Sequence, residues 1–153
     1  MRVHQIRRDN NRFFLLLLAG LWCLAVSTHS FAADEIVSPD NIPGSEKVDA
    51  EQLISLVDKV PQLIIIDSRI ASDRIQGHIE GSISLPDEKT TCDTLHEHAP
   101  NSDAAVLFYC NGPKCGRSAV AVNIALQCGY KNVYWFRGGF EEWKKKKYPY
   151  IKE

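Results

Sequence analysis

The sequence has almost no net charge, no internal repeat and no apolar segment long enough to cross a membrane. Its 153 residues contain 18 Lys and Arg against 19 Asp and Glu, so the basic face that a nucleic-acid partner requires is not expected. The longest apolar run, residues 13–26, is 14 residues long, whereas a spanning helix needs about 20. The motif C-x-x-C is also absent, which argues against a thioredoxin-like oxidoreductase.

The first 32 residues have the layout of a secretory signal peptide. An arginine-rich start precedes the apolar run, and small and polar residues follow it. We place cleavage after Ala32, because Ser30 and Ala32 then occupy the two positions that require small residues. An uncleaved signal anchor is the alternative, and the short apolar run argues against it. We therefore expect a periplasmic or secreted protein without stable membrane association after cleavage.

Cleavage would leave 121 residues, enough for one domain with its own core, and 14 basic against 18 acidic residues. Four cysteines remain in this part of the chain: Cys92, Cys110, Cys115 and Cys128. An exported protein meets an oxidising compartment, in which exposed pairs of thiols form disulfides. Cys92 and Cys128 either form a structural disulfide or lie apart, and we expect Cys128 to be a buried helix residue.

Residues 33–46 contain two prolines, a glycine and several acidic residues, and they are predicted to form a flexible leader before a folded domain at 47–153. Helical and strand patterns alternate along this domain, beginning with a helix that Asp49 and Gln52 are expected to cap. Strands buried on both faces are typical of parallel sheets. We therefore predict an α/β fold of three layers, α/β/α, around a mostly parallel sheet of roughly five strands.

The segment 106–128 joins a buried strand, a cysteine-led loop and a helix. Cys110 directly follows the strand, where N–H groups of the loop and the helix dipole would stabilise a thiolate. Ligands of parallel sheets bind beyond the carboxyl ends of the strands, and Asp67 also lies at such an end. The pattern predicts a reactive thiol at Cys110, and the alternative is a buried, inert cysteine.

Five segments of the chain together resemble a single rhodanese domain: LIIIDSR, GHIEGSISLP, the strand ending in YC, the helix start RSA, and YWFRGGFEEW. They span residues 48–143 and follow the order of the family. The resemblance implies a rhodanese-like fold with Cys110 as the nucleophile that carries sulfur. It also implies that Asp67, Arg69 and residues 137–139 support the site and do not catalyse.

The chemistry expected of such a site is double displacement. The Cys110 thiolate would attack a small anionic sulfur donor such as thiosulfate, and the persulfide would then give its outer sulfur to a thiol or cyanide-like acceptor. Arg117 is expected to bind the anion through its planar guanidinium. Further substrate contacts are predicted from four residues of the loop: Asn111, Gly112, Lys114 and Gly116. We expect no metal and no cofactor.

The loop departs from the usual pattern of the family in its length. Six residues separate Cys110 from Arg117, whereas about four are common in rhodaneses. Related phosphatases place the two residues about five apart, so the spacing argues against phosphatase or arsenate reductase activity.

A second cysteine, Cys115, lies within the loop. It is either a resolving thiol, which attacks a Cys110 persulfide or forms a disulfide with Cys110, or itself the nucleophile, because it lies nearer the helix start. The thiol pair also leaves a second class of function open. In that class, the protein is a rhodanese-like module without turnover that binds an anion or a partner protein and senses redox state through Cys110 and Cys115.

Overall fold

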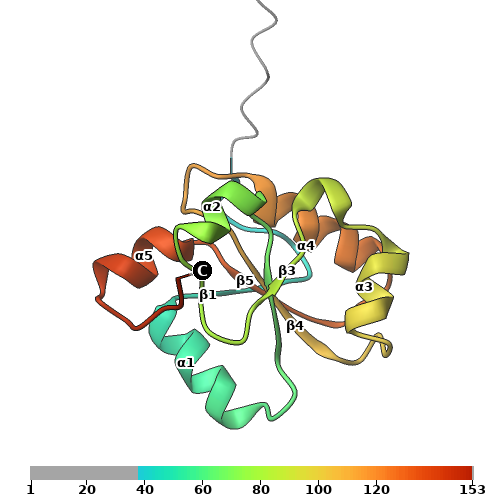
Figure 1. Cartoon of the computed structure of the whole chain (residues 1–153). Helices are drawn as coiled ribbons and strands as arrows, with labels where there is room; N and C mark the ends of the chain where they lie inside the picture. The colour runs from blue at the N-terminus through green and yellow to red at the C-terminus, as the bar shows by residue number, and fades with distance from the viewer. Residues whose placement is uncertain (1–37, 153) are drawn as a thin grey trace, which may run out of the picture. The chain divides into compact units, whose positions relative to one another are not determined.

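Five parallel strands form the central sheet of residues 38–152, the part of the chain that the computed structural model describes. The strand order is β1-β5-β4-β2-β3. Figure 1 shows the strands at the centre of the fold with helices around them. The strands are β1 (Glu46–Val48), β2 (Ile64–Asp67), β3 (Ile83–Ser84), β4 (Ala105–Tyr109) and β5 (Asn132–Phe136). The predicted five-stranded parallel sheet is confirmed.

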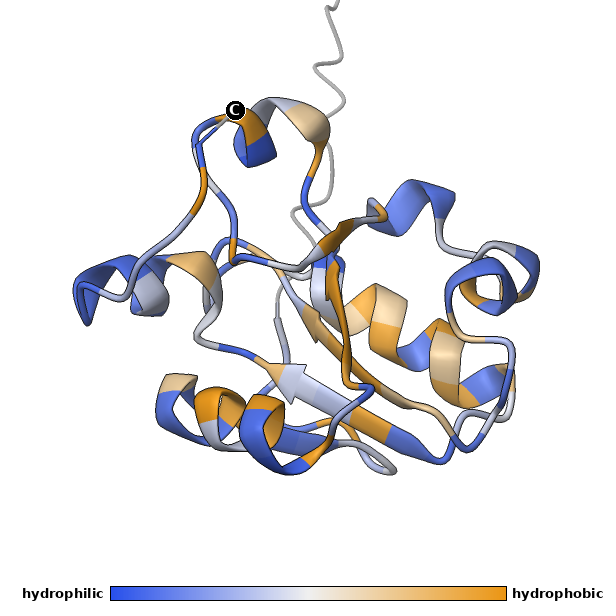
Figure 2. Ribbon diagram, turned by 60° about the horizontal axis from the view of Figure 1, so that its bottom comes forward, coloured by the Kyte–Doolittle hydropathy of each residue, from blue (hydrophilic) through white to orange (hydrophobic). Residues whose placement is uncertain are grey.

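Helices cover both faces of this sheet. Side chains of α1 (Ala50–Lys59) and α5 (Gly139–Lys145) pack in the core on one face, and those of α3 (Cys92–His98) and α4 (Arg117–Gln127) pack on the other. The short α2 (Ala71–Ile75) and the 3-10 turn η1 (Asp87–Lys89) follow β2 and β3. Figure 2 shows apolar stretches of the helices turned toward apolar strands. Within residues 38–152, no helix has the length and apolar composition required to span a bilayer.

The unbroken apolar sequence of β4 is explained by its burial on both faces of the sheet. Val106 and Phe108 belong to the core under α3 and α4, whereas Leu107 and Tyr109 belong to the core under α1 and α5. Successive side chains of a strand point to opposite faces, so a strand between two layers of helices needs apolar residues at every position. The burial of β4 on both faces, predicted from its composition, is confirmed.

Helix α1 begins at the cap that the sequence predicts. The backbone N–H of Gln52 donates to Asp49 Oδ1 at 2.8 Å, and the backbone N–H of Asp49 donates to Gln52 Oε1 at 2.9 Å. This capping box satisfies two N–H groups that have no partner within the helix. Helix α3 begins in the same way, with Thr91 and Thr94 as the reciprocal pair.

The flexible leader predicted for residues 33–46 does not hold for residues 38–46. Ile42 is only 5% exposed and packs in the core, and Ser38 is buried. Glu46 already belongs to β1 and pairs with Tyr134 of β5. A single buried isoleucine and a three-residue edge strand give no periodic pattern, which is why the sequence pointed to a leader. Residues 33–37 and the predicted signal peptide at 1–32 lie outside the described residues.

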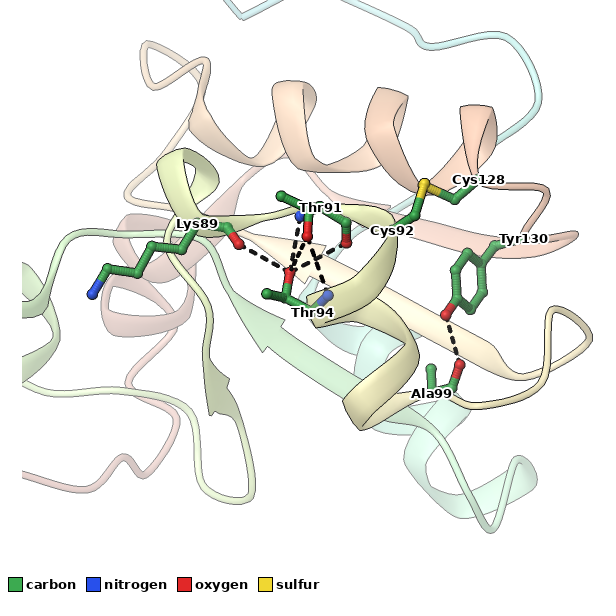
Figure 3. Close-up of a disulfide and its surroundings, with 7 residues drawn as sticks. All are labelled: Lys89, Thr91, Cys92, Thr94, Ala99, Cys128 and Tyr130. Carbon is green, nitrogen blue, oxygen red and sulfur yellow. Dashed lines mark hydrogen bonds between the residues drawn. A yellow bond between two sulfur atoms is a disulfide. The ribbon is translucent and has the colours of Figure 1, made fainter.

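A disulfide joins Cys92 at the start of α3 to Cys128 at the end of α4 (Figure 3). The two Cα atoms are 5.5 Å apart, and Cys128 lies 36 positions after Cys92 in the sequence. Cross-linking a loop of this length removes entropy from the unfolded chain and stabilises the fold by about 4 kcal/mol. The open question of this pair is thereby answered. Cys128 itself is half-buried at the helix end, so the expectation of a buried helix residue was wrong.

Candidate functional site

The site lies where β2 and β4 end side by side. Asp67 and Tyr109 are partners in the register of these two strands, and both are the last residues of their strands. Cys110 follows directly, and the loop 110–116 leads to α4. The predicted meeting of Asp67 and the cysteine-led loop at one edge of the sheet is confirmed.

Beneath the loop lies a buried ion pair. Arg69 Nε donates to Asp67 Oδ1 at 2.8 Å and Arg69 Nη2 to Asp67 Oδ2 at 2.6 Å, and each side chain is 1% exposed. The Tyr109 hydroxyl donates to Asp67 Oδ2 at 2.8 Å, and Arg69 Nη2 also donates to the carbonyl oxygen of Gly77 at 2.8 Å. Burial raises the pKa of the Tyr109 hydroxyl, which keeps it a donor. These contacts hold the segment after β2 against the end of β4, and so support the position at which the cysteine-led loop begins.

The start of α5 holds the first residues of the loop. The N–H groups of Phe140 and Glu141 donate to the carbonyl oxygens of Cys110 and Asn111 at 2.9 and 2.7 Å. Gly139 has φ +58°, and a Cβ at this position would lie 2.4 Å from the Cys110 carbonyl oxygen. Only glycine combines this backbone conformation with so close an approach. The first residues of α5 therefore hold the loop by backbone hydrogen bonds, and Gly139 allows the two segments to approach.

The Cys110 side chain points into the protein and is shielded from solvent. The residue is 1% exposed, and its Sγ lies 3.0 Å from the carbonyl oxygen of Cys115 and 4.0 Å from that of Gly112. The Ser118 hydroxyl donates to Cys110 Sγ at 3.1 Å and accepts from Trp135 Nε1 at 3.0 Å. The hydrogen bond to the Cys115 thiol and burial together raise the pKa of the Cys110 thiol. Cys110 is therefore protonated at neutral pH.

The Cys115 side chain lies among donors that favour its ionised form. The Cys110 side chain lies beside it, the backbone N–H groups of Asn111 and Arg117 donate to it, and the Arg117 guanidinium adds positive charge. These contacts lower the pKa of the Cys115 thiol to about 6. The residue is half-buried and stands just before the first turn of α4, where the helix dipole favours an anion. The lowered pKa favours the thiolate form of Cys115.

The two cysteines of the loop differ in burial and in the direction of their pKa shifts. The sequence predicts Cys110 as the ionised thiol in a cradle of N–H groups, with Cys115 as the alternative. The pKa of Cys115 is lowered and that of the buried Cys110 is raised, which favours the alternative as the site of the thiolate. Cys110 directly follows β4, whereas Cys115 directly precedes Gly116, the N-cap of α4.

Arg117 lies beside the thiolate, but its guanidinium already has one carboxylate partner. Arg117 Nη1 donates to Asp87 Oδ1 of η1 at 2.8 Å, and this contact raises the pKa of the arginine. The Arg117 side chain is 35% exposed, so part of the guanidinium can meet an incoming anion. Lys114 is exposed at the tip of the loop, which suits attraction of an anion over a distance.

The remaining loop residues predicted as substrate contacts have mainly internal roles. Asn111 Nδ2 donates to Asp73 Oδ2 of α2 at 2.8 Å, so its side chain is used within the protein. Gly112 is buried, and a Cβ there would lie 2.4 Å from Glu141 Oε2. Gly116 is also buried, at the N-cap of α4. Of the predicted N–H donors, Asn111 contributes to the cradle of the thiolate.

Three residues of the site were missed from the sequence. Ser118 and Trp135 hold Cys110, and Asp87 holds Arg117. Ser118 follows Arg117 in the RSA segment. Its position at the helix start could have indicated that its hydroxyl faces the loop. Trp135 lies within an apolar strand, so its sequence context predicts only a core residue. No local sequence pattern connects Asp87 with Arg117.

Comparisons with known proteins place this chain in a family. A model of the rhodanese-like domain matches residues 49–146. The chain belongs to the rhodanese-like family. A solved protein of Bacillus halodurans is 28% identical to this rhodanese-like chain, with a TM-score of 0.63 over 71% of this chain and 77% of that one. A thiosulfate sulfurtransferase from Pseudomonas aeruginosa is 23% identical with a TM-score of 0.58, covering 71% of this chain and 20% of that one, and shares the fold.

Curated relatives of this rhodanese-like chain have diverse activities. A tRNA uridine(34) hydroxylase from Photorhabdus laumondii is 30% identical over 74% of this chain and 32% of its own length. An M-phase inducer phosphatase from Caenorhabditis elegans is 27% identical over 70% of this chain and 40% of its own length. The chain thus spans about a third of the length of the first of these relatives and less than half of the second. Sulfur transfer is represented in the family alongside other chemistry.

Proposed function

We propose that this protein is an exported sulfurtransferase that takes sulfane sulfur from a small anionic donor such as thiosulfate and passes it on through a persulfide. The observation that carries the proposal is the half-buried Cys115 thiol, held by two backbone N–H groups at the start of α4 with a pKa of about 6. A thiolate at neutral pH beside a guanidinium is what attack on an anionic sulfur donor requires. We place the persulfide on Cys115 because the Cys110 sulfur is buried and protonated.

In the first step, Cys115 Sγ attacks the sulfane sulfur of thiosulfate and forms a new S–S bond. The bond between the two sulfur atoms of thiosulfate breaks, and sulfite leaves with the electron pair. Arg117 offsets negative charge on donor and leaving group, and the N–H groups of Asn111 and Arg117 stabilise the thiolate before attack. An acceptor of the thiol or cyanide class would then take the outer sulfur.

Export is supported by two independent features of the chain. Residues 1–32 have the three-part layout of a signal peptide. The Cys92–Cys128 disulfide suits an oxidising compartment, because disulfides are rare where thiols are kept reduced.

A rhodanese-like module without turnover is the competing interpretation, and one experiment separates the two. The full chain is expressed, the purified protein is reduced under conditions that leave Cys92–Cys128 intact, and thiosulfate is added in excess while sulfite is followed. We expect a rapid burst of about one sulfite per protein. The control is the same protein with its loop thiols alkylated, which should give no burst. Binding of thiosulfate without release of sulfite would establish the module and contradict the enzyme.

A further inference from the structure

The mechanism above leaves one group unused, the buried thiol of Cys110. Its sulfur lies 3.0 Å from the carbonyl oxygen of Cys115, so the two cysteines are neighbours across the loop. The residue is 1% exposed, so an external thiol, disulfide or donor anion has almost no access to it. The structure therefore leaves one reaction partner for Cys110, which is a persulfide formed on Cys115.

We propose, on the basis of the proposed function, that Cys110 resolves the Cys115 persulfide within the protein and releases the outer sulfur as sulfide, so that the domain reduces sulfane sulfur. Cys110 Sγ attacks Cys115 Sγ, an S–S bond forms between the two cysteines, and the S–S bond of the persulfide breaks. The thiol proton of Cys110 goes to the departing sulfur, which leaves as HS⁻. Two thiols are oxidised to a disulfide while the sulfane sulfur is reduced by two electrons.

The contacts of Cys110 suit this attack. The Ser118 hydroxyl donates to Cys110 Sγ at 3.1 Å and is itself fixed by Trp135 Nε1 at 3.0 Å. These two side chains hold the sulfur beside Cys115 and stabilise negative charge as the proton departs. Ser118 is thus a positioning residue for the second step, and it is buried with 1% exposure.

The cycle closes through an external dithiol. The sulfur of Cys115 is the more exposed member of the resulting disulfide, so a dithiol reductant attacks there and restores both thiols. The substrate class is therefore a small sulfane-sulfur anion, and the co-substrate is a dithiol, which dithiothreitol replaces in the assay. Because Cys115 is half-buried and Cys110 is buried, the dithiol reaches the Cys115 sulfur and not the Cys110 sulfur.

The test uses a single addition of thiosulfate to the reduced full-chain protein without any external thiol. Sulfite and sulfide are measured separately, and peptide mapping locates disulfides and persulfides. We expect about one equivalent of sulfite, followed by about one equivalent of sulfide and a Cys110–Cys115 disulfide. The variant Cys110→Ser should still release sulfite, more slowly because the hydrogen bond to Cys115 is altered, retain the added sulfur on Cys115, and form at least tenfold less sulfide.

Two further variants keep the result interpretable. Ser118→Ala should slow sulfide release several-fold more than it slows sulfite release, which loss of structure alone would not do. Cys92→Ser/Cys128→Ser should still form sulfide, because its only remaining pair among residues 38–152 is Cys110 and Cys115. Normal sulfite with a stable persulfide and no sulfide in the unmodified protein would overturn this inference and leave the proposed function standing. Absence of sulfite would overturn the proposed function itself.

Discussion

Replacement of Cys115 by serine is expected to abolish the sulfite burst, with a loss of at least about a thousandfold in rate. The serine hydroxyl has an ordinary pKa far above neutrality, so the N–H groups of Asn111 and Arg117 would no longer stabilise an anion ready to attack. Cys110 is a poor substitute because its pKa is raised and it is buried. The measurement is stopped-flow detection of sulfite from thiosulfate at pH 7.

The matched variant for this experiment is Cys110→Ser, in which the other loop thiol is removed by the same chemical change. We expect its burst to fall by less than about tenfold, because a hydroxyl at this position still donates toward Cys115. The opposite outcome, a burst lost in Cys110→Ser and kept in Cys115→Ser, would place the nucleophile on Cys110.

Replacement of Arg69 by methionine is expected to lower the free energy of unfolding by about 3 kcal/mol. Methionine keeps much of the side-chain length and the packing against Phe140, over whose ring the guanidinium lies at 4.4 Å. It leaves Asp67 buried without its main partner, and this uncompensated charge is the cost. Tyr109 and Arg74, at 2.8 and 3.3 Å from Asp67 Oδ2, remain and keep the loss near the lower end of the range for buried pairs.

Urea denaturation of Arg69→Met and of Lys131→Met measures the effect against an exposed pair. Lys131 lies 2.9 Å from Asp103, but the two side chains are 68% and 60% exposed. Such surface pairs contribute less than about 1 kcal/mol, so Lys131→Met should be nearly neutral. A loss below about 1 kcal/mol in Arg69→Met as well would contradict the supporting role of the buried pair.

The fold was predictable because its signals are local and repeated. Asp49 and Gln52 cap α1 through contacts three residues apart, and the unbroken apolar run of β4 reflects burial on both faces. Parallel topology then brings Asp67 and the loop after Tyr109 to the same edge of the sheet. The segment around Ile42 was not predictable, because its burial depends on a contact with the distant core and leaves no periodic trace.

The candidate site was predictable only in part, for a different reason. The sequence locates the cysteine-led loop at the start of α4, but the ionisation of two thiols depends on which peptide groups face each sulfur. Carbonyl oxygens of Gly112 and Cys115 and the Ser118 hydroxyl lie against the Cys110 sulfur, whereas the N–H groups of Asn111 and Arg117 face Cys115. Such orientations follow from the fold of an unusually long loop. The contact from Trp135 through Ser118 to Cys110 likewise joins three elements that no sequence pattern connects.

The central claim is that Cys115, and not Cys110, is the ionised thiol of the loop. It is tested most directly by limited alkylation of the reduced protein with iodoacetamide between pH 4 and 9, followed by peptide mapping. A thiolate forms as the pH rises through the pKa, so a lowered pKa keeps the reactive form present at lower pH. We expect the label on Cys115, with a midpoint at about pH 6 and a tenfold fall in rate per pH unit below it. Label on Cys110, or a midpoint near the ordinary thiol value of about 8.5, would contradict the account.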